Sequence, residues 1–221
     1  MEEMISSTNI LSLYEIYNFA KKSIKSAGFE QEGQWQVGLN FHHFSETDLL
    51  RESAWVILCS GFKEKIIRKI FNYISLCFCD WESAKEIAVN ENLCRETALS
   101  QINNRQKVNA IIQVAHIIFA TGFEQLKKRI IKNPINELKL FPYIGDITSY
   151  HLAKNLGFPL AKPDRHLARL ASWIGFNDVQ TLCGTLSKHT GDPISYVDLV
   201  LWRFATLQPA YLQTWQKKVT H

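Results

Sequence analysis

The chain lacks several features that would assign it to a membrane or secreted class. No run approaches 18 apolar residues, the minimum for a membrane-spanning helix. The first residues, MEEM followed by a polar stretch, lack the basic and apolar regions of a secretory signal. The five cysteines are odd in number and show no paired spacing, so they predict no disulfide framework. These absences predict a reduced, intracellular protein with no membrane contact.

Motifs for common cofactors are also missing. The sequence contains neither a Walker A loop nor a GxGxxG fingerprint. The seven histidines and five cysteines form no group with the spacing of metal ligands. We therefore expect neither a bound nucleotide nor a metal.

Charge is modest overall but unevenly distributed. The net charge is +4 and the pI is about 8.7. Residues 122–170 hold nine Lys and Arg against four Asp and Glu, a surplus of five that exceeds the charge of the whole chain. Such a concentration suits an anionic partner. For a run such as Lys127-Lys128-Arg129, a solvated helical face is the alternative.

Hydrophobic periodicity predicts an all-α protein of about ten to twelve helices. Its 221 residues are enough for one core or for two small lobes. Only residues 33–44 alternate apolar and polar positions, which predicts an extended or loop-like segment.

Local signals predict where helices begin and end. Ser45 followed by Asp48 predicts a helix start, and Gly61 an interruption. Asp80 is expected to cap a short helix that ends near Val89. Thr121 followed by Glu124 has the spacing of a capping box.

Residues 140–170 concentrate the chemistry of the chain. A tight turn at 141–146 precedes a helical pattern, and Pro163-Asp164 opens the next helix. Amides at the first of these helix starts, with the helix dipole, suit a phosphate. Asp164 suits a helix N-cap, and the same carboxylate can stabilise a cationic sugar and orient a water molecule.

This stretch resembles the helix-hairpin-helix and catalytic Asp of the HhH-GPD superfamily of DNA glycosylases. The family hairpin, roughly Leu-Pro-Gly-hydrophobic-Gly-x-x-Thr-Ala, corresponds to FPYIGDITS at 141–149, and the Asp motif to DRHLAR at 164–169. The resemblance extends to residues 105–107, and more weakly to 48–71 and 197–205. It implies an all-α, two-lobe glycosylase, with residues 1–79 and 171–221 in one lobe and 80–170 in the other.

Three departures from the family pattern define the expected chemistry. Tyr143 replaces the first hairpin glycine, where the family binds a monovalent cation and approaches a phosphate, so a monovalent cation at this hairpin stays an open alternative to no cofactor. Ile147 stands where bifunctional members carry a Schiff-base lysine, which implies base removal by water without lyase activity. Cys183 is the only cysteine in the C-terminal half, so no iron–sulfur cluster is expected.

The resemblance implies a set of site residues. Asp164 is the expected catalytic residue. The expected DNA contacts are Tyr143, Gly145, Ile147, Thr148, Lys162, Arg165, His166, Phe62 and Lys63. The candidates for the base pocket are Trp35, Glu52 and Trp55. For Phe62, the expected wedge that fills the gap left by a flipped base, a place in the core is the alternative, and for His166 a structural role.

The predicted function is base-excision repair of double-stranded DNA by a monomer, in the cytoplasm with the nucleoid or in the nucleus. Two alternatives stay open. One is a non-catalytic DNA-binding or assembly protein on the same scaffold. The other is a lyase with a relocated amine, at Lys154 or Lys162.

Overall fold

The computed structural model describes the backbone of residues 7–219 and the side chains of residues 13–215. Within these residues the chain is all-α, with fourteen α-helices, one 3-10 helix and no strand. This confirms the predicted fold class. No helix among residues 7–219 has both the length and the apolar character needed to span a bilayer.

The chain divides into two compact units, residues 1–39 with 157–221, and residues 40–156. The borders predicted from the sequence lay at 79/80 and 170/171. The structure places them earlier in both cases, because α3 and α4 pack on helices of the second unit and α11 packs on α12 and α13.

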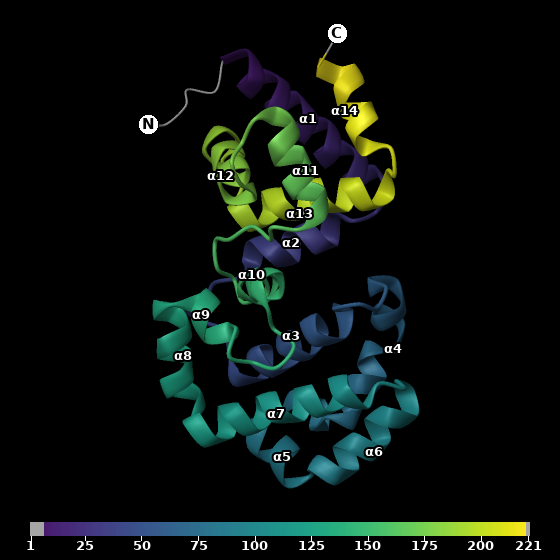
Figure 1. The fold of residues 1–221 in the computed structure, drawn as a ribbon, viewed down its shortest axis with the longest axis vertical. Helices are drawn as coiled ribbons and strands as arrows, with labels where there is room; N and C mark the ends of the chain where they lie inside the picture. Colours follow the sequence, from purple (N-terminus) through teal and green to yellow (C-terminus); the bar gives the residue numbers. More distant parts are fainter. Residues whose placement is uncertain (1–6, 220–221) are drawn as a thin grey trace. The chain divides into compact units, whose positions relative to one another are not determined.

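The first unit contains six helices: α1 (Ser7–Ser26), α2 (Glu30–Gly38), α11 (Arg165–Ile174), α12 (Val179–Thr190), α13 (Ile194–Leu207) and α14 (Tyr211–Val219). Helix α13 lies at its centre and packs against α1, α2, α11 and α12 (Figure 1). Its apolar side chains, including Val197, Leu201 and Phe204, are buried in one core with Tyr17 and Trp215. This core includes the start of the segment that leads to Asp164, since Ala161 is one of its members.

Helix α2 corrects the prediction of an extended or loop-like segment for residues 33–38, whereas residues 39–44 form turn and loop as predicted. Gly33 lies against the ring of Tyr196, so close that an added Cβ would overlap it. Arg203 of α13 donates to both carboxylate oxygens of Glu32, at 3.0 Å to Oε1 and at 3.1 and 2.7 Å to Oε2. These contacts with a distant helix hold a segment whose own hydrophobic pattern is poor for a helix.

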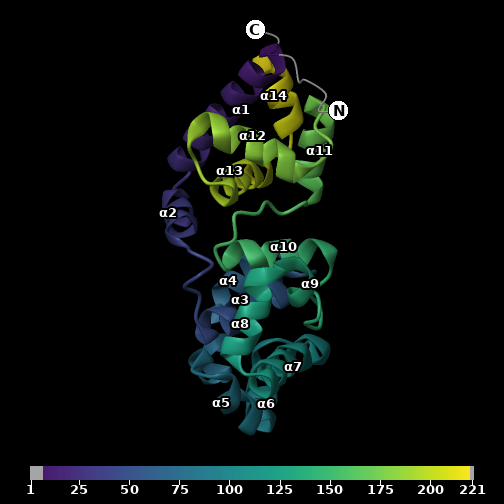
Figure 2. The same cartoon turned by 90° about the vertical axis from the view of Figure 1, so that its left-hand side faces the viewer.

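The second unit contains the other helices: α3 (Glu46–Cys59), α4 (Glu64–Cys77), the 3-10 helix η1 (Cys79–Trp81), α5 (Ala84–Val89), α6 (Glu91–Gln101), α7 (Arg105–Thr121), α8 (Phe123–Lys132), α9 (Pro134–Leu138) and α10 (Asp146–Asn155). Helix α7 packs against α3, α5, α6 and α8 (Figure 2). Helix α10 packs on α3 and α9. The two central helices, α3 and α7, therefore carry the elements on which the turn at 141–146 rests.

Several predicted helix ends are confirmed. The Ser45 side chain and Asp48 form a reciprocal capping box at the start of α3. Gly61 has a φ of +95° between α3 and α4, a conformation that few other residues adopt easily.

Two predicted caps are wrong. Helix α7 continues to Thr121. Helix α8 begins at Phe123, directly after Gly122, and no side chain caps its start. Asp80 has a φ of +49° inside η1, and Ser83 caps α5 through a bond from the amide of Glu86. In both places the residue types suited a helix cap, but the N-cap position is taken by another residue, Gly122 for α8 and Ser83 for α5.

Candidate DNA-binding and catalytic site

A tight turn joins α9 to α10. The amide of Ile144 donates to the carbonyl of Phe141 at 3.1 Å, which closes a four-residue turn with Pro142 in its second position and Tyr143 in its third. Phe141 and Ile144 are buried, so they anchor the turn to the second unit. Pro in the second position and a left-handed residue in the third are typical of a type II turn.

Tyr143 occupies that left-handed position with a φ of +64°. A glycine would take this conformation freely, whereas a side chain makes it costly. The Tyr143 hydroxyl donates to Gln106 Oε1 at 2.9 Å, which ties the turn to the first turn of α7. Position 143 thus has the backbone shape that a glycine favours.

The outer edge of the turn presents the predicted DNA contacts. Tyr143 is 43% exposed and Ile147 is 48% exposed, and Gly145 is exposed between them. The amide of Gly145 donates to Thr148 Oγ1 at 2.7 Å. In this conformation a phosphate would therefore bind the next first-turn amides, those of Asp146 and Ile147, which have no partner within the helix.

A carboxylate already lies at this helix start. Asp146 is exposed and forms an ion pair with Lys139. The Lys139 ammonium holds the pKa of Asp146 below its usual value. The pair leaves the helix start close to neutral, so a phosphate would be held mainly by the amides.

Asp164 caps α11 in the first unit, as predicted. Its Oδ1 accepts from the amides of His166 at 2.9 Å and Leu167 at 3.1 Å. Among the described residues, Oδ2 accepts no hydrogen bond. One oxygen therefore holds the helix start and the other retains its lone pairs.

The loop before Asp164 is fixed by side chains of the same unit. The amide of Ala161 donates to Gln180 Oε1 at 2.8 Å, and that of Lys162 to the buried Asp198 Oδ1 at 3.0 Å. The amide of Asp164 donates to the carbonyl of Lys162 at 2.8 Å. These bonds, rather than a helix, determine where Asp164 lies.

The residues after Asp164 divide between solvent and core. Arg165 is exposed, whereas His166 is half-buried with its ring edge-on to Tyr211 at 5.5 Å. Burial lowers the pKa of His166 below its usual value. Its Nδ1 is buried and has no hydrogen-bond partner among the described residues. These contacts favour the structural alternative for His166.

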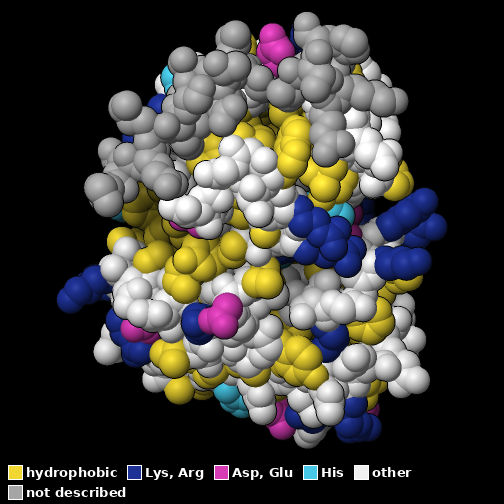
Figure 3. Space-filling model, turned by 45° about the horizontal axis from the view of Figure 1, so that its top comes forward, with side chains coloured by type: hydrophobic (Ala, Val, Ile, Leu, Met, Phe, Trp, Pro, Cys, Tyr) yellow, Lys and Arg dark blue, Asp and Glu magenta, His cyan; other side chains and the backbone are white. Residues whose placement is uncertain are grey.

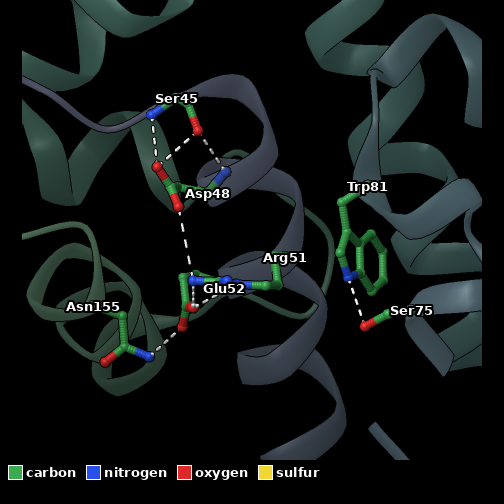
Figure 4. A network of polar contacts seen from close by, with 7 residues as sticks. All are labelled: Ser45, Asp48, Arg51, Glu52, Ser75, Trp81 and Asn155. Carbon is green, nitrogen blue, oxygen red and sulfur yellow. Dashed lines mark hydrogen bonds and ion pairs between the residues drawn. The ribbon is translucent and has the colours of Figure 1, made fainter. Parts of the chain in front are cut away.

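Glu52 is the most buried of the predicted pocket residues, at 6% exposure on α3. Its carboxylate accepts from Asn155 Nδ2 of α10 at 2.8 Å and from Arg51 Nε at 3.2 Å (Figure 4). Arg51 Nη2 also lies 3.7 Å from Asp48 Oδ1. The capping residues of α3 and Glu52 therefore belong to one polar network. Burial raises the pKa of Glu52 above its usual value.

The other two pocket candidates lie elsewhere. Trp55, also on α3, packs edge-on against Phe71 with ring centroids 5.0 Å apart and lies under Arg68. Trp35 belongs to α2 in the first unit and is 43% exposed. The structure therefore joins Trp55 to the contact between α3 and α4 and links Glu52 to α10.

Lys107, at the start of α7, was not among the predicted site residues. It is buried, and its Nζ donates to the carbonyls of Ile57 and Ser60 at the end of α3. The same Nζ lies 5.4 Å from the ring of Phe62 and 5.3 Å from the ring of Tyr143. Phe62, half-buried, and Tyr143 thus share one neighbour, while Lys63 is exposed beside Phe62.

Some of the basic side chains of residues 122–170 form contacts within the fold. Lys127 Nζ donates to the carbonyl of Phe44 at 2.7 Å and Arg129 pairs with Glu137 at 2.7 Å. Lys128 and Lys132 are exposed on the same helix. On the face drawn in Figure 3, Lys and Arg side chains lie at several separate places, and fewer Asp and Glu side chains are visible.

Comparisons with protein-family models, with curated proteins and with solved structures find no match for this chain. Residues 7–219 contain no group of three or more His, Cys, Asp or Glu side chains placed to hold a metal ion.

Proposed function

We propose that this protein is a monofunctional DNA glycosylase of the HhH-GPD type, acting in base-excision repair on double-stranded DNA. The observation that carries the proposal is the turn between α9 and α10. Its left-handed third position and its exposed edge occur where the resemblance expects a phosphate-binding hairpin. The capped Asp164 follows in the order that the family requires.

The reaction would break the bond between C1′ of the sugar and the base nitrogen. The base leaves with the bonding electrons and takes up a proton, while the oxygen of a water molecule bonds to C1′ and the water gives up a proton in exchange. Asp164 would stabilise the positive charge on the sugar and orient that water through Oδ2, the oxygen that is free of the helix cap. In the second unit, the amides at the start of α10 would hold a phosphate of the DNA backbone.

The absence of an amine at position 147 supports hydrolysis without strand cleavage. Lys154, one of the two relocated candidates, is buried in α10. The backbone of Lys162, the other, is bonded to Asp198. The exposed edge of the turn carries Ile147, whose side chain has no amine.

A panel of duplexes, each with one damaged or mispaired base, tests the proposal. Full-length protein in excess is incubated with each duplex, and the products are separated with and without hot alkali. We expect at least one duplex to break at the lesion after alkali and to stay intact without it. If no duplex breaks, and an abasic analogue is bound no better than intact duplex, the protein is a non-catalytic DNA-binding scaffold instead.

A further inference from the structure

Lys107 has a buried ammonium group whose desolvation is offset by hydrogen bonds to backbone carbonyls. A buried ammonium is costly unless its protons are donated. Lys107 is 5% exposed, and its Nζ donates to the carbonyls of Ile57 and Ser60 and lies 3.5 Å from that of Leu58. These carbonyls end α3, where a cation is favoured by the helix dipole.

The same ammonium joins two turns that are far apart in the sequence. Phe62 comes from the turn between α3 and α4, and Tyr143 from the turn between α9 and α10. Both rings lie within 5.4 Å of Lys107 Nζ, a distance at which a cation attracts an aromatic face. Lys107 therefore fixes both turns to the start of α7, and the bond from Tyr143 to the adjacent Gln106 adds to this.

The left-handed backbone of Tyr143 indicates that its side chain is retained for a function. A non-glycine residue in the left-handed region costs on the order of 1 kcal/mol or more, and it persists only where its surroundings hold it. Glycine at position 143 would avoid that cost. The tyrosine instead holds a half-exposed ring beside Lys107, next to the helix start where a phosphate would bind.

We infer that Lys107 is a positioning residue for DNA recognition, which holds Phe62 and Tyr143 as one rigid aromatic surface that contacts bases where the duplex is opened. The inference rests on the proposed function. Lys107 acts through the two rings and touches no phosphate, since its ammonium is enclosed by carbonyls. Aromatic side chains stack on any unpaired base, which suits a site that must accept disrupted DNA.

The test uses full-length Lys107→Met with Lys63→Met as the matched control. Lys63 is an exposed lysine next to Phe62. Affinities are measured for a duplex with a tetrahydrofuran abasic analogue and for the intact duplex, over a range of salt concentrations. A 2-aminopurine opposite the analogue reports unstacking by its fluorescence.

For Lys107→Met we expect the preference for the abasic duplex to fall about tenfold, the size of one lost base–aromatic contact. The 2-aminopurine signal should fall with it, while affinity for intact duplex and its salt dependence stay unchanged. For Lys63→Met the salt slope should fall by about 1, as for a lost phosphate contact, with the preference retained.

Two results overturn the inference while the proposed function stands. One is a folded Lys107→Met that keeps the wild-type preference. The other is a loss of salt slope in Lys107→Met equal to that of Lys63→Met, which would make Lys107 a phosphate ligand. A wild type that binds both duplexes equally instead contradicts the proposed function, and the inference with it.

If Lys107→Met does not fold, Phe62→Leu, Tyr143→Leu and the double variant decide. If the two rings act as one surface, the double variant should lose little more of the preference for the abasic duplex than the single variant with the larger loss. Additive losses would mean that the two rings act separately and would overturn the inference.

Discussion

One carboxylate oxygen of Asp164 accepts hydrogen bonds from two amides at the start of α11, and among the described residues the other oxygen accepts none. Glu52 is buried, and its carboxylate accepts hydrogen bonds from Asn155 and Arg51. The first residue lies at a helix start, where amides stabilise a carboxylate. The second lies in the interior of the second unit, where burial favours the neutral acid. The raised pKa of Glu52 makes the stability of the chain depend on pH, and that dependence can be measured by unfolding alone.

Replacement of Glu52 by Gln should remove a pH dependence of unfolding. The pKa of Glu52 in the folded chain is raised above the ordinary value of 4.5, so between the two values the folded state binds more protons than the unfolded state. The free energy of unfolding therefore falls as pH rises through this window. Gln keeps an oxygen for Asn155 and carries no charge.

Urea denaturation of both proteins from pH 4 to pH 8 measures the effect. Glu52→Gln should gain stability relative to the wild type as pH rises above about 4.5, the reference for an exposed glutamate. Parallel stability curves for the two proteins would show that Glu52 is not the group responsible.

At the scale of a helix, α2 depends on close contact with α13. Gly33→Ala places a methyl group where the Tyr196 ring lies, so we expect a loss of about 1–3 kcal/mol in the free energy of unfolding. Gly38→Ala is the matched control, because an added Cβ at Gly38 has no atom within 4 Å. It should be neutral or stabilising by up to about 1 kcal/mol.

Urea unfolding of the two variants checks this expectation. Equal effects of the two substitutions would mean that α2 does not pack against Tyr196 in solution. That outcome would also remove the reason why a segment with an alternating pattern forms a helix.

The same helix shows what the sequence could and could not predict. Strong periodic segments such as α3, α7 and α13, and a cap such as Ser45, depend on neighbouring residues and were predictable. Helix α2 depends on Tyr196 and Arg203, more than 160 positions away, and no local pattern contains that information.

The candidate site divides in the same way. Asp164 as a cap follows from its place before a helical pattern, and the turn follows from Pro142 and Gly145, whereas the exposure of the Tyr143 and Ile147 side chains does not follow from their residue types. The role of Lys107 follows from carbonyls and rings that only the fold brings together. One local signal was present, since a lysine in the first turn of a helix opposes the helix dipole and requires a compensating contact.

For the whole molecule, the proposed chemistry excludes a covalent intermediate with DNA. Borohydride added during the reaction should trap no protein–DNA adduct, because Ile147 replaces the Schiff-base lysine. A bifunctional glycosylase, assayed in parallel on its own substrate, shows that trapping works. An adduct on this protein that disappears in Lys154→Ala or Lys162→Ala would establish a relocated lyase amine.

The most direct test of the account is single-turnover base release by Asp164→Asn, on the duplex that the wild type processes best. Asn caps helices as well as Asp does, so thermal unfolding should change little. The rate of base release should fall by about 10²-fold or more, because the variant loses the charge that stabilises the sugar cation. A folded Asp164→Asn protein that releases the base at nearly the wild-type rate would contradict the assignment of Asp164 as the catalytic residue.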